Sequence, residues 1–204
     1  MVPPALLESI LPGRTAPRVA PLPPSRRSGL NPRVNVREIA SRLAAAEDWT
    51  GALGTERREW RLVARTPDFD AWLIAWPSGG KVELHDHGNS TGAVSVISGA
   101  LVEAVPSRDD MGRLSLVRHE LQAGATLGFG AGHVHDVTNE SAHRALSLHV
   151  YSPALTSMTF YEVAGEKLMV REVAWPDDGS GEFDNSLRTR SIEAQRGGVA
   201  AASR

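Results

Sequence analysis

The sequence predicts a mostly β protein, an antiparallel sandwich or barrel preceded by one short helix. From about residue 59 onward, short apolar runs follow one another and are separated by Gly, Pro, Asn and Asp. Closely spaced short strands without intervening helices are typical of antiparallel sandwiches and barrels. The chain has 204 residues and is 41% apolar, which suffices for one domain with a buried core. The expected strands cover residues 59–65, 69–76, 93–99, 100–105, 114–121, 125–130, 135–139, 144–152, 158–165 and 167–175.

A single helix is expected ahead of these strands. Apolar residues recur there at helical spacing, at Val36, Ile39, Ala40 and Leu43. Asn35 is suited to cap the start of this helix, which we expect to pack on the outside of the strands. Residues 1–33 are rich in proline and arginine and show no apolar period, so they predict a disordered leader. The remaining chain divides into one domain over 34–190 and a flexible tail over 191–204.

The composition excludes several classes of protein. The chain contains no cysteine, so disulfide scaffolds, thiolate metal sites and cysteine nucleophiles are excluded. A formal net charge of −2 gives no basic surface for nucleic acid or for an acidic membrane. No apolar run approaches the roughly 18 residues of a membrane span, and "ALLESIL" near the N-terminus is too short for a secretory signal. We therefore expect a cytoplasmic protein without nucleic-acid or membrane partners. The sequence does not indicate an oligomeric state, and a monomer is compatible with it.

The histidines are concentrated in the region of strands. All seven lie between residues 85 and 149. His85 and His87 are two positions apart, as are His133 and His135, so each pair is expected to share one face of a strand. Imidazole is the commonest protein ligand for metals. Two separated pairs inside one small barrel therefore predict a metal site, whereas a lone histidine such as His119 is interpreted as structural.

A second polar group lies on the expected strand 144–152. In "LSLHVY", Ser147, His149 and Tyr151 alternate with aliphatic residues, so the three polar side chains share one face. A water-facing strand is the ordinary explanation for such alternation. The combination of Ser, His and Tyr instead favours a hydrogen-bonded relay at a site, in which Ser147 orients His149 and His149 orients the Tyr151 hydroxyl.

The spacing of glycines and histidines resembles the two cupin motifs. The first motif is matched by Gly79, His85, His87 and Gly99, and Gly92 stands where the family has glutamate. The second is matched by Gly124, Gly132, His135 and Asn139, and Gly130 replaces the proline. The resemblance implies a jelly-roll barrel (a double-stranded β-helix) with one metal ion held inside by His85, His87 and His135.

A narrower resemblance is to the cysteine dioxygenase family. It is carried by "HDHGNSTGAV", "HDVTN" and the Ser-x-His-x-Tyr row, which is followed by Ser-Pro. In that family a three-histidine Fe(II) centre adds both atoms of O2 to the sulfur of cysteine. The resemblance implies three histidine ligands and makes Ser147, His149 and Tyr151 the neighbouring catalytic residues. Mammalian members carry a cysteine at the position of Gly92 that crosslinks to the tyrosine, so the glycine resembles the bacterial branch and leaves Tyr151 a free phenol.

The substrate is expected to be L-cysteine together with O2. The family binds the substrate carboxylate with an arginine on a strand ahead of the first histidine pair, and arginine suits carboxylate because it donates two parallel hydrogen bonds. Arg61 and Arg65 are four positions apart on one expected strand and should share a face. We assign Arg61 to the carboxylate, with Arg65 as the alternative. Enzymes acting on 3-mercaptopropionate carry glutamine there, and this segment has none.

Two other classes of function remain open at this stage. One is a cupin isomerase that acts on a sugar with zinc or manganese, which the absent glutamate and the Ser-His-Tyr row disfavour. The other is a non-catalytic, metal-bearing cupin that serves as a binding or sensor module. Another small thiol, such as 3-mercaptopropionate, is the alternative substrate for a dioxygenase.

Overall fold

Two antiparallel sheets form the body of the molecule in the computed structural model, which describes residues 34–49, 51–53, 57–174 and 180–182. The predictions for the leader (1–33) and for the tail (191–204) lie outside the described residues. No helix in the described part of the chain is long and apolar enough to cross a membrane.

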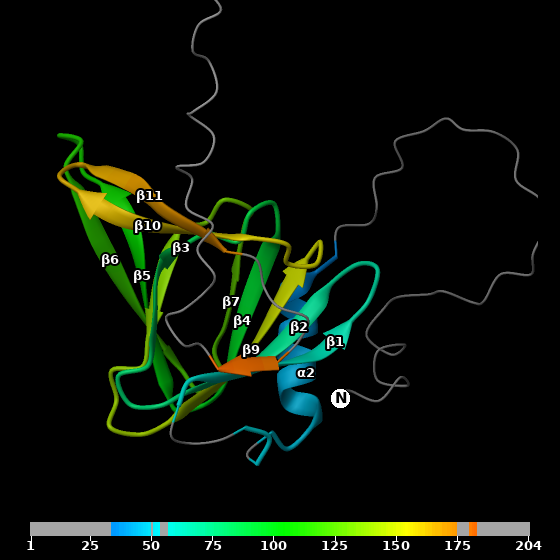
Figure 1. Cartoon of the computed structure of the whole chain (residues 1–204). Helices are drawn as coiled ribbons and strands as arrows, with labels where there is room; N and C mark the ends of the chain where they lie inside the picture. Colours follow the sequence, from blue (N-terminus) through cyan, green and yellow to red (C-terminus); the bar gives the residue numbers. More distant parts are fainter. Residues whose placement is uncertain (1–33, 50, 54–56, 175–179, 183–204) are drawn as a thin grey trace, which may run out of the picture.

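Each sheet has six strands, and the two sheets face each other (Figure 1). The first sheet has the order β12-β1-β2-β9-β4-β7, with β12 at Ser180–Glu182, β1 at Glu59–Arg65, β2 at Asp70–Trp76, β9 at Ala145–Ser152, β4 at Thr91–Ser98 and β7 at Thr126–Phe129. The second has the order β11-β10-β3-β8-β5-β6, with β11 at Lys167–Ala174, β10 at Met158–Ala164, β3 at Lys81–His85, β8 at His135–Thr138, β5 at Ala100–Arg108 and β6 at Leu114–Gln122.

The predicted fold class is confirmed. Strands that are distant in the sequence pair within each sheet, as a jelly-roll barrel requires, and every strand expected from the sequence is present within a few residues of its expected ends. Two strands were missed. Lys81–His85 was not among the expected strands, and Ser180–Glu182 was taken as the end of the compact region, whereas it pairs with β1.

The expected helix is α2, Val36–Ala46. The side chain of Asn35 accepts a hydrogen bond from the backbone N–H of Glu38, which caps the helix start. The four apolar residues at helical spacing are all buried, and the helix packs on the outer face of β4 and β9 (Figure 1). Because this face of the first sheet is filled by the helix and its apolar partners, the opposite face lines the interior of the barrel.

Glycine and asparagine residues of the cupin-like motifs have structural explanations. Gly99 has φ +73°, and a Cβ there would lie 2.7 Å from the carbonyl oxygen of Arg144, so no other residue fits this turn. Asn139 is fully buried, and its side-chain amide donates to the carbonyl oxygens of Trp76, Pro77 and His143. It thereby joins the chain after β2 to the chain after β8.

The interior of the barrel has apolar residues at both ends and polar residues between them. One cluster joins the two sheets and contains Trp76, Val82, Val96, Leu101, Val137, Ala145, Phe160 and Ala174. The other contains Trp72, Tyr151 and Leu155, with Trp60, Leu62, Phe129 and Met158 packed against it. The buried polar residues His85, His87, His135, Ser147 and His149 lie in the same interior.

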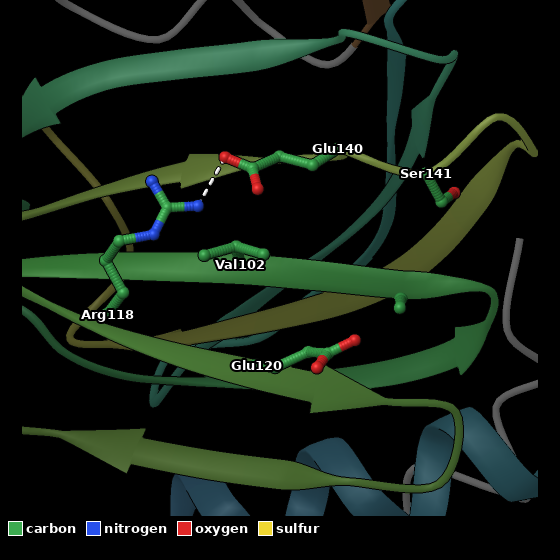
Figure 2. Close-up of a pocket in the computed structure, with 6 residues that line it drawn as sticks. Val102, Arg118, Glu120, Glu140 and Ser141 are labelled. Carbon is green, nitrogen blue, oxygen red and sulfur yellow. Dashed lines mark hydrogen bonds and ion pairs between the residues drawn. The ribbon is translucent and has the colours of Figure 1, made fainter.

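A surface groove lies on the outer face of the second sheet (Figure 2). Its volume is about 410 Å³, and it is lined by residues of β5, β6 and the chain after β8. Arg118 and Glu140 form an ion pair across it. Arg118 and Glu120 lie on the face of β6 opposite to its inward-facing residues, so this groove is separate from the interior histidines.

Candidate metal centre

Three histidines converge inside the barrel. His85 ends β3 and pairs in register with His135, which begins β8, while His87 lies in the loop two residues beyond the strand. The Nε2 atoms of His85 and His87 are 3.2 Å apart, and one ligand nitrogen from each of the three rings lies within 4.8 Å of the others. All three side chains are buried. We call these residues the histidine cluster. Of the second expected pair, only His135 joins it.

Hydrogen bonds fix which nitrogen two of these rings direct inward. Nδ1 of His85 lies 2.7 Å from the carbonyl oxygen of Glu83, and Nδ1 of His135 lies 2.7 Å from a carboxylate oxygen of Glu103. Since both partners accept, both Nδ1 atoms carry the hydrogen and both Nε2 atoms keep a free lone pair. Outer partners of this kind orient histidine ligands in metal sites.

The third ring, His87, is oriented by stacking. Its Nδ1 is buried and has no hydrogen-bond partner in the described part of the chain. Its ring lies between two aromatic rings, with its centroid 5.0 Å from that of Phe129 and 4.8 Å from that of Tyr151. The interplanar angles are 27° and 30°, so both neighbours stack on it. The strands β7, which carries Phe129, and β9, which carries Tyr151, therefore both help to hold this imidazole.

All three imidazoles are held in the neutral form that binds metal ions. Burial lowers the pKa of His85 well below its usual value, and a proton on His135 would lower it further. Burial also lowers the pKa of His87 well below the usual range. For His135, burial lowers the pKa, and the hydrogen bond with Glu103 partly opposes the change. The cluster presents free lone pairs rather than cations at neutral pH.

Glu103 is a functional candidate that the sequence reasoning missed. It is 2% exposed on β5, and its Oε1 atom lies 2.7 Å from Nδ1 of His135 and 2.9 Å from Nε2 of His133. Burial raises the pKa of this carboxyl group, but the hydrogen bonds with the two histidines outweigh it and lower the pKa to about 2. The carboxylate thus stays ionised behind His135. A lone acid within the apolar run "ALVEAV" was the signal for it.

An aromatic ring occupies the place beside Gly92. Gly92 pairs with Phe129 on one side and with Tyr151 on the other. A Cβ on Gly92 would lie 2.5 Å from Cζ of Phe129, so the ring leaves no room for a side chain. No carboxylate therefore faces the histidine cluster from the position where the cupin motif has glutamate. Three neutral nitrogens without a bound anion suit a divalent ion that keeps open positions for other ligands.

The three polar residues of β9 form the expected chain of contacts. Ser147 Oγ lies 2.9 Å from Nε2 of His149, and the Tyr151 hydroxyl lies 3.3 Å from Nδ1 of His149. All three are buried on the inner face, so this is not a water-facing strand. Burial lowers the pKa of His149 to about 3, and burial together with the charge of Asp70 raises the pKa of Tyr151. We call these residues the polar row.

Arg61 is not placed where the sequence reasoning expected it. The pairing of β1 with β2 is irregular between Leu62 and Ala64, so the alternation of faces changes there and Arg61 and Arg65 do not share a face. Arg61 pairs with Leu73, whose side chain packs with α2, and is exposed on the outer face. The Arg61 side chain therefore points away from the histidine cluster, and its role toward the substrate carboxylate stays a prediction.

Two other arginines lie on the inner side of this sheet. Arg65 pairs with Asp70, and its guanidinium is 3.8 Å from the Asp70 carboxylate and 5.9 Å from the centre of the Trp72 ring. Arg58 directly precedes β1, and its guanidinium lies 6.0 Å from the Trp60 ring and 5.8 Å from the Trp76 ring. The sequence reasoning did not consider Arg58, because it precedes the expected strand.

The charge of Arg58 acts on the interior of the barrel. It contributes to the lowered pKa of both His85 and His149, although burial is the larger cause for each. Burial lowers the pKa of Arg58 itself to about 10, so it remains a cation at neutral pH. Arg58 is thus a partly buried cation over the ring of Trp76, which in turn lies 6.1 Å from the ring of His149 in the polar row.

Asp86 has a structural role that was not expected. Its carboxylate accepts hydrogen bonds from the backbone N–H groups of Gly88 and Thr159 and from the hydroxyl of Tyr161. These bonds hold the loop that carries His87 against β10. The Asp86 carboxylate therefore helps to fix the position of His87.

A jelly-roll barrel with converging histidines inside defines the cupin class. Within that class, a family model described as "Cysteine dioxygenase type I" matches residues 31–164, which is more than half of the chain. The chain belongs to this family, a family of metal-dependent oxygenases.

Several solved structures are similar to parts of the chain. TT1209 from Thermus thermophilus is 24% identical, with 53% of this chain and 96% of that chain covered and a TM-score of 0.42. KdgF from a Halomonas species is 19% identical, with 46% and 76% covered and a TM-score of 0.40. The cupin domain of Schizosaccharomyces pombe Cnp3 is 10% identical, with 50% and 65% covered and a TM-score of 0.41.

Proposed function

We propose that this protein is a thiol dioxygenase that converts L-cysteine and O2 to cysteine sulfinate at an Fe(II) centre held by His85, His87 and His135. The observation that carries the proposal is the combination of three neutral imidazoles with the buried polar row and with Phe129 in place of a carboxylate. Both oxygen atoms of O2 are transferred to the sulfur, so the reaction consumes one thiol and one O2 and requires no external reductant.

The donor set fits a ferrous ion. Two Nε2 lone pairs are directed inward by hydrogen bonds on the opposite side of each ring, and the third ring is held between two aromatic rings. Bound Fe(II) would supply the redox chemistry that lets O2 react with a thiol. Imidazole ligands leave the site without a protein anion, so a substrate thiolate can provide the negative charge.

In this proposal Tyr151 binds and orients the reactants. Its phenol stays protonated because burial and the charge of Asp70 raise its pKa. It lies against the ring of His87 and is held by His149. From there its hydroxyl donates a hydrogen bond to the substrate carboxylate or to O2. A preorganised donor of this kind stabilises charge that develops in a transition state.

Arg58 takes the place of Arg61 as the group that recognises the substrate carboxylate. It is a partly buried cation over Trp76, whose ring adjoins that of His149, whereas Arg61 is exposed on the other face of the sheet. A guanidinium in a buried site binds carboxylate with two parallel hydrogen bonds. This supports a thiol that carries a carboxylate, with 3-mercaptopropionate as the alternative to cysteine. We further propose that the reaction takes place in the cytoplasm, where small thiols are kept reduced, and that it needs neither nucleic acid nor a membrane.

The proposal is tested by purifying the full chain without oxygen, measuring its metal content and following O2 uptake with a panel of small thiols. We expect iron to support turnover, cysteine to be the best substrate, and one O2 to be consumed per cysteine sulfinate formed. Mass spectrometry identifies the product. If iron binds but none of the thiols yields a sulfinate, the proposal is wrong and a metal-bearing binding module becomes the better explanation.

A further inference from the structure

The indole of Trp76 lies at one end of the polar row. Trp76 is on β2, is 1% exposed, and directs its Nε1 atom to the Ser147 hydroxyl oxygen at 2.8 Å. An indole N–H is a donor only. The oxygen of Ser147 must therefore accept at this contact. This fixes the direction of the first hydrogen bond in the polar row.

The hydroxyl hydrogen of Ser147 then has one acceptor. Ser147 is fully buried, and in the part of the chain that the structure describes its hydroxyl contacts only the Trp76 indole and Nε2 of His149, which is 2.9 Å away. Since the indole accepts nothing, the hydrogen goes to His149. The reverse arrangement, with Nε2–H of His149 donating to Ser147, leaves a buried hydroxyl hydrogen without an acceptor, which is costly.

The direction passes through His149 to Tyr151. His149 is neutral, because burial lowers its pKa to about 3, so its ring carries one hydrogen. When Nε2 accepts from Ser147, that hydrogen is on Nδ1, which faces the Tyr151 oxygen at 3.3 Å. The tyrosine oxygen then accepts, and its own hydrogen remains available for a different partner.

We propose that Trp76 is a positioning residue that sets the direction of every hydrogen bond in the polar row, so that Tyr151 offers a hydrogen and not a lone pair to the interior beside the histidine cluster. The Tyr151 ring stacks on the ring of His87, so this residue adjoins the cluster, and its hydroxyl lies at the His149 end of the contact. The catalytic use of this hydrogen rests on the proposed function, whereas the direction of the bonds does not.

The direction is measured as the tautomer of His149. The full chain, labelled with ¹⁵N in its histidines and kept free of paramagnetic metal, is examined by NMR correlations between ring nitrogens and ring protons. His149 is assigned by comparison with His149→Gln. We expect Nδ1 to carry the hydrogen and Nε2 to carry the lone pair.

The role of Trp76 is tested by removing only its N–H group. Benzothienylalanine at position 76 keeps the bicyclic shape and replaces N–H by sulfur, so packing is preserved, and Trp76→Phe provides a genetic counterpart. Without the donor, Ser147 can accept from His149, and we expect a mixture of both His149 tautomers. In the iron-loaded enzyme, turnover should fall about fivefold with little change in KM, comparable to the loss of one neutral hydrogen bond.

Trp72→Phe is the matched control. Trp72 is buried on the same face of the same strand, and its indole nitrogen makes no hydrogen bond to the polar row. Its replacement should leave the His149 tautomer unchanged. Hydrogen on Nε2 of His149 in the unaltered chain, or an unchanged Nδ1–H tautomer in the benzothienylalanine chain, overturns the inference. The expected tautomers in a protein that oxidises no thiol uphold the inference and refute the proposed function.

Discussion

The ring of Phe129 lies over Gly92 on the neighbouring strand and fills the space that a side chain at Gly92 would need. The two residues pair in register, and Phe129 also stacks on His87 and on His133. One aromatic ring therefore replaces the carboxylate of the cupin motif and at the same time supports a residue of the histidine cluster. A fourth protein ligand has no room at Gly92, because the Phe129 side chain occupies the volume that such a ligand would need.

Adding a methyl group at Gly92 tests this arrangement. We expect Gly92→Ala to destabilise the chain by about 1–3 kcal/mol, because the new Cβ would overlap the Phe129 ring. In a chain that already carries Phe129→Leu, the same Gly92→Ala change should cost at most half as much unfolding free energy. Urea unfolding of the four chains of this cycle gives the coupling free energy. If the two changes simply add, Phe129 is not what excludes a side chain at Gly92.

The metal ligands are tested by single replacements. His87→Ala should abolish retention of iron and all activity, because one of three converging nitrogens is lost. The matched control is His119→Ala, since His119 is exposed on β6 and belongs to neither group of possible ligands. It should change neither property. Full iron occupancy in His87→Ala, measured by elemental analysis, would show that the ligand assignment is wrong.

Carboxylate recognition is tested by comparing two arginines on opposite sides of the first sheet. Arg58→Gln should lower kcat/KM for cysteine at least tenfold, because a partly buried cation over Trp76, beside His149, is removed. It should weaken the use of cysteine more than that of 3-mercaptopropionate. Arg61→Gln should have little effect on either substrate, since Arg61 is exposed on the outer face. Equal losses in both variants would remove Arg58 from substrate recognition.

Tyr151→Phe should keep the fold and the iron but lower turnover. We expect a loss of about one to two orders of magnitude, less than the largest values for a preorganised donor because a second donor can compensate. Denaturing gels provide a separate observation. The chain contains no cysteine, so it should run as a single species before and after turnover. Unchanged turnover in Tyr151→Phe would mean that the polar row is structural.

Acid should destabilise the metal-free chain partly through His149. Its pKa is about 3 in the folded chain and about 6.5 when unfolded, so below pH 6.5 the unfolded state binds one more proton. This contribution to stability is fully present above pH 6.5 and is lost as the pH falls toward 3. Between pH 6 and pH 5 the unaltered chain should lose about 1 kcal/mol more unfolding free energy than His149→Gln. Parallel curves for the two chains would contradict the lowered pKa.

Most of the fold was predicted from the spacing of apolar residues, which repeats every two residues in the strands and every 3.6 residues in the helix. The apolar residues of α2 and the alternation along β9 are local properties of the sequence, and each appears in the structure as expected. The grouping of His85, His87 and His135 could also be expected, since it depends on motif spacings. These features share one cause, which is that the pattern of side chains within one element decides which face is buried.

Features that depend on contacts between distant elements could not be predicted in this way. Phe129 covers Gly92 only because β7 and β4 pair, and Glu103 reaches His135 only because β5 lies beside β8. Trp76 was not connected with the polar row, although β2 and β9 are neighbours in the sheet. The wrong face for Arg61 has a local cause, since one irregularity in β1 breaks the alternation on which the assignment relied.

That irregularity in β1 separates the strand into two halves whose inward-facing positions are set independently. Before it, Trp60 and Leu62 pack against the cluster around Tyr151, and after it Arg65 pairs with Asp70 on the same inner side. Val63 is the extra residue between them, so a change of length by one residue at this point alters the inward-facing set on one side only. The side chain at position 65 can therefore be replaced while Trp60 and Leu62 keep their register with β2.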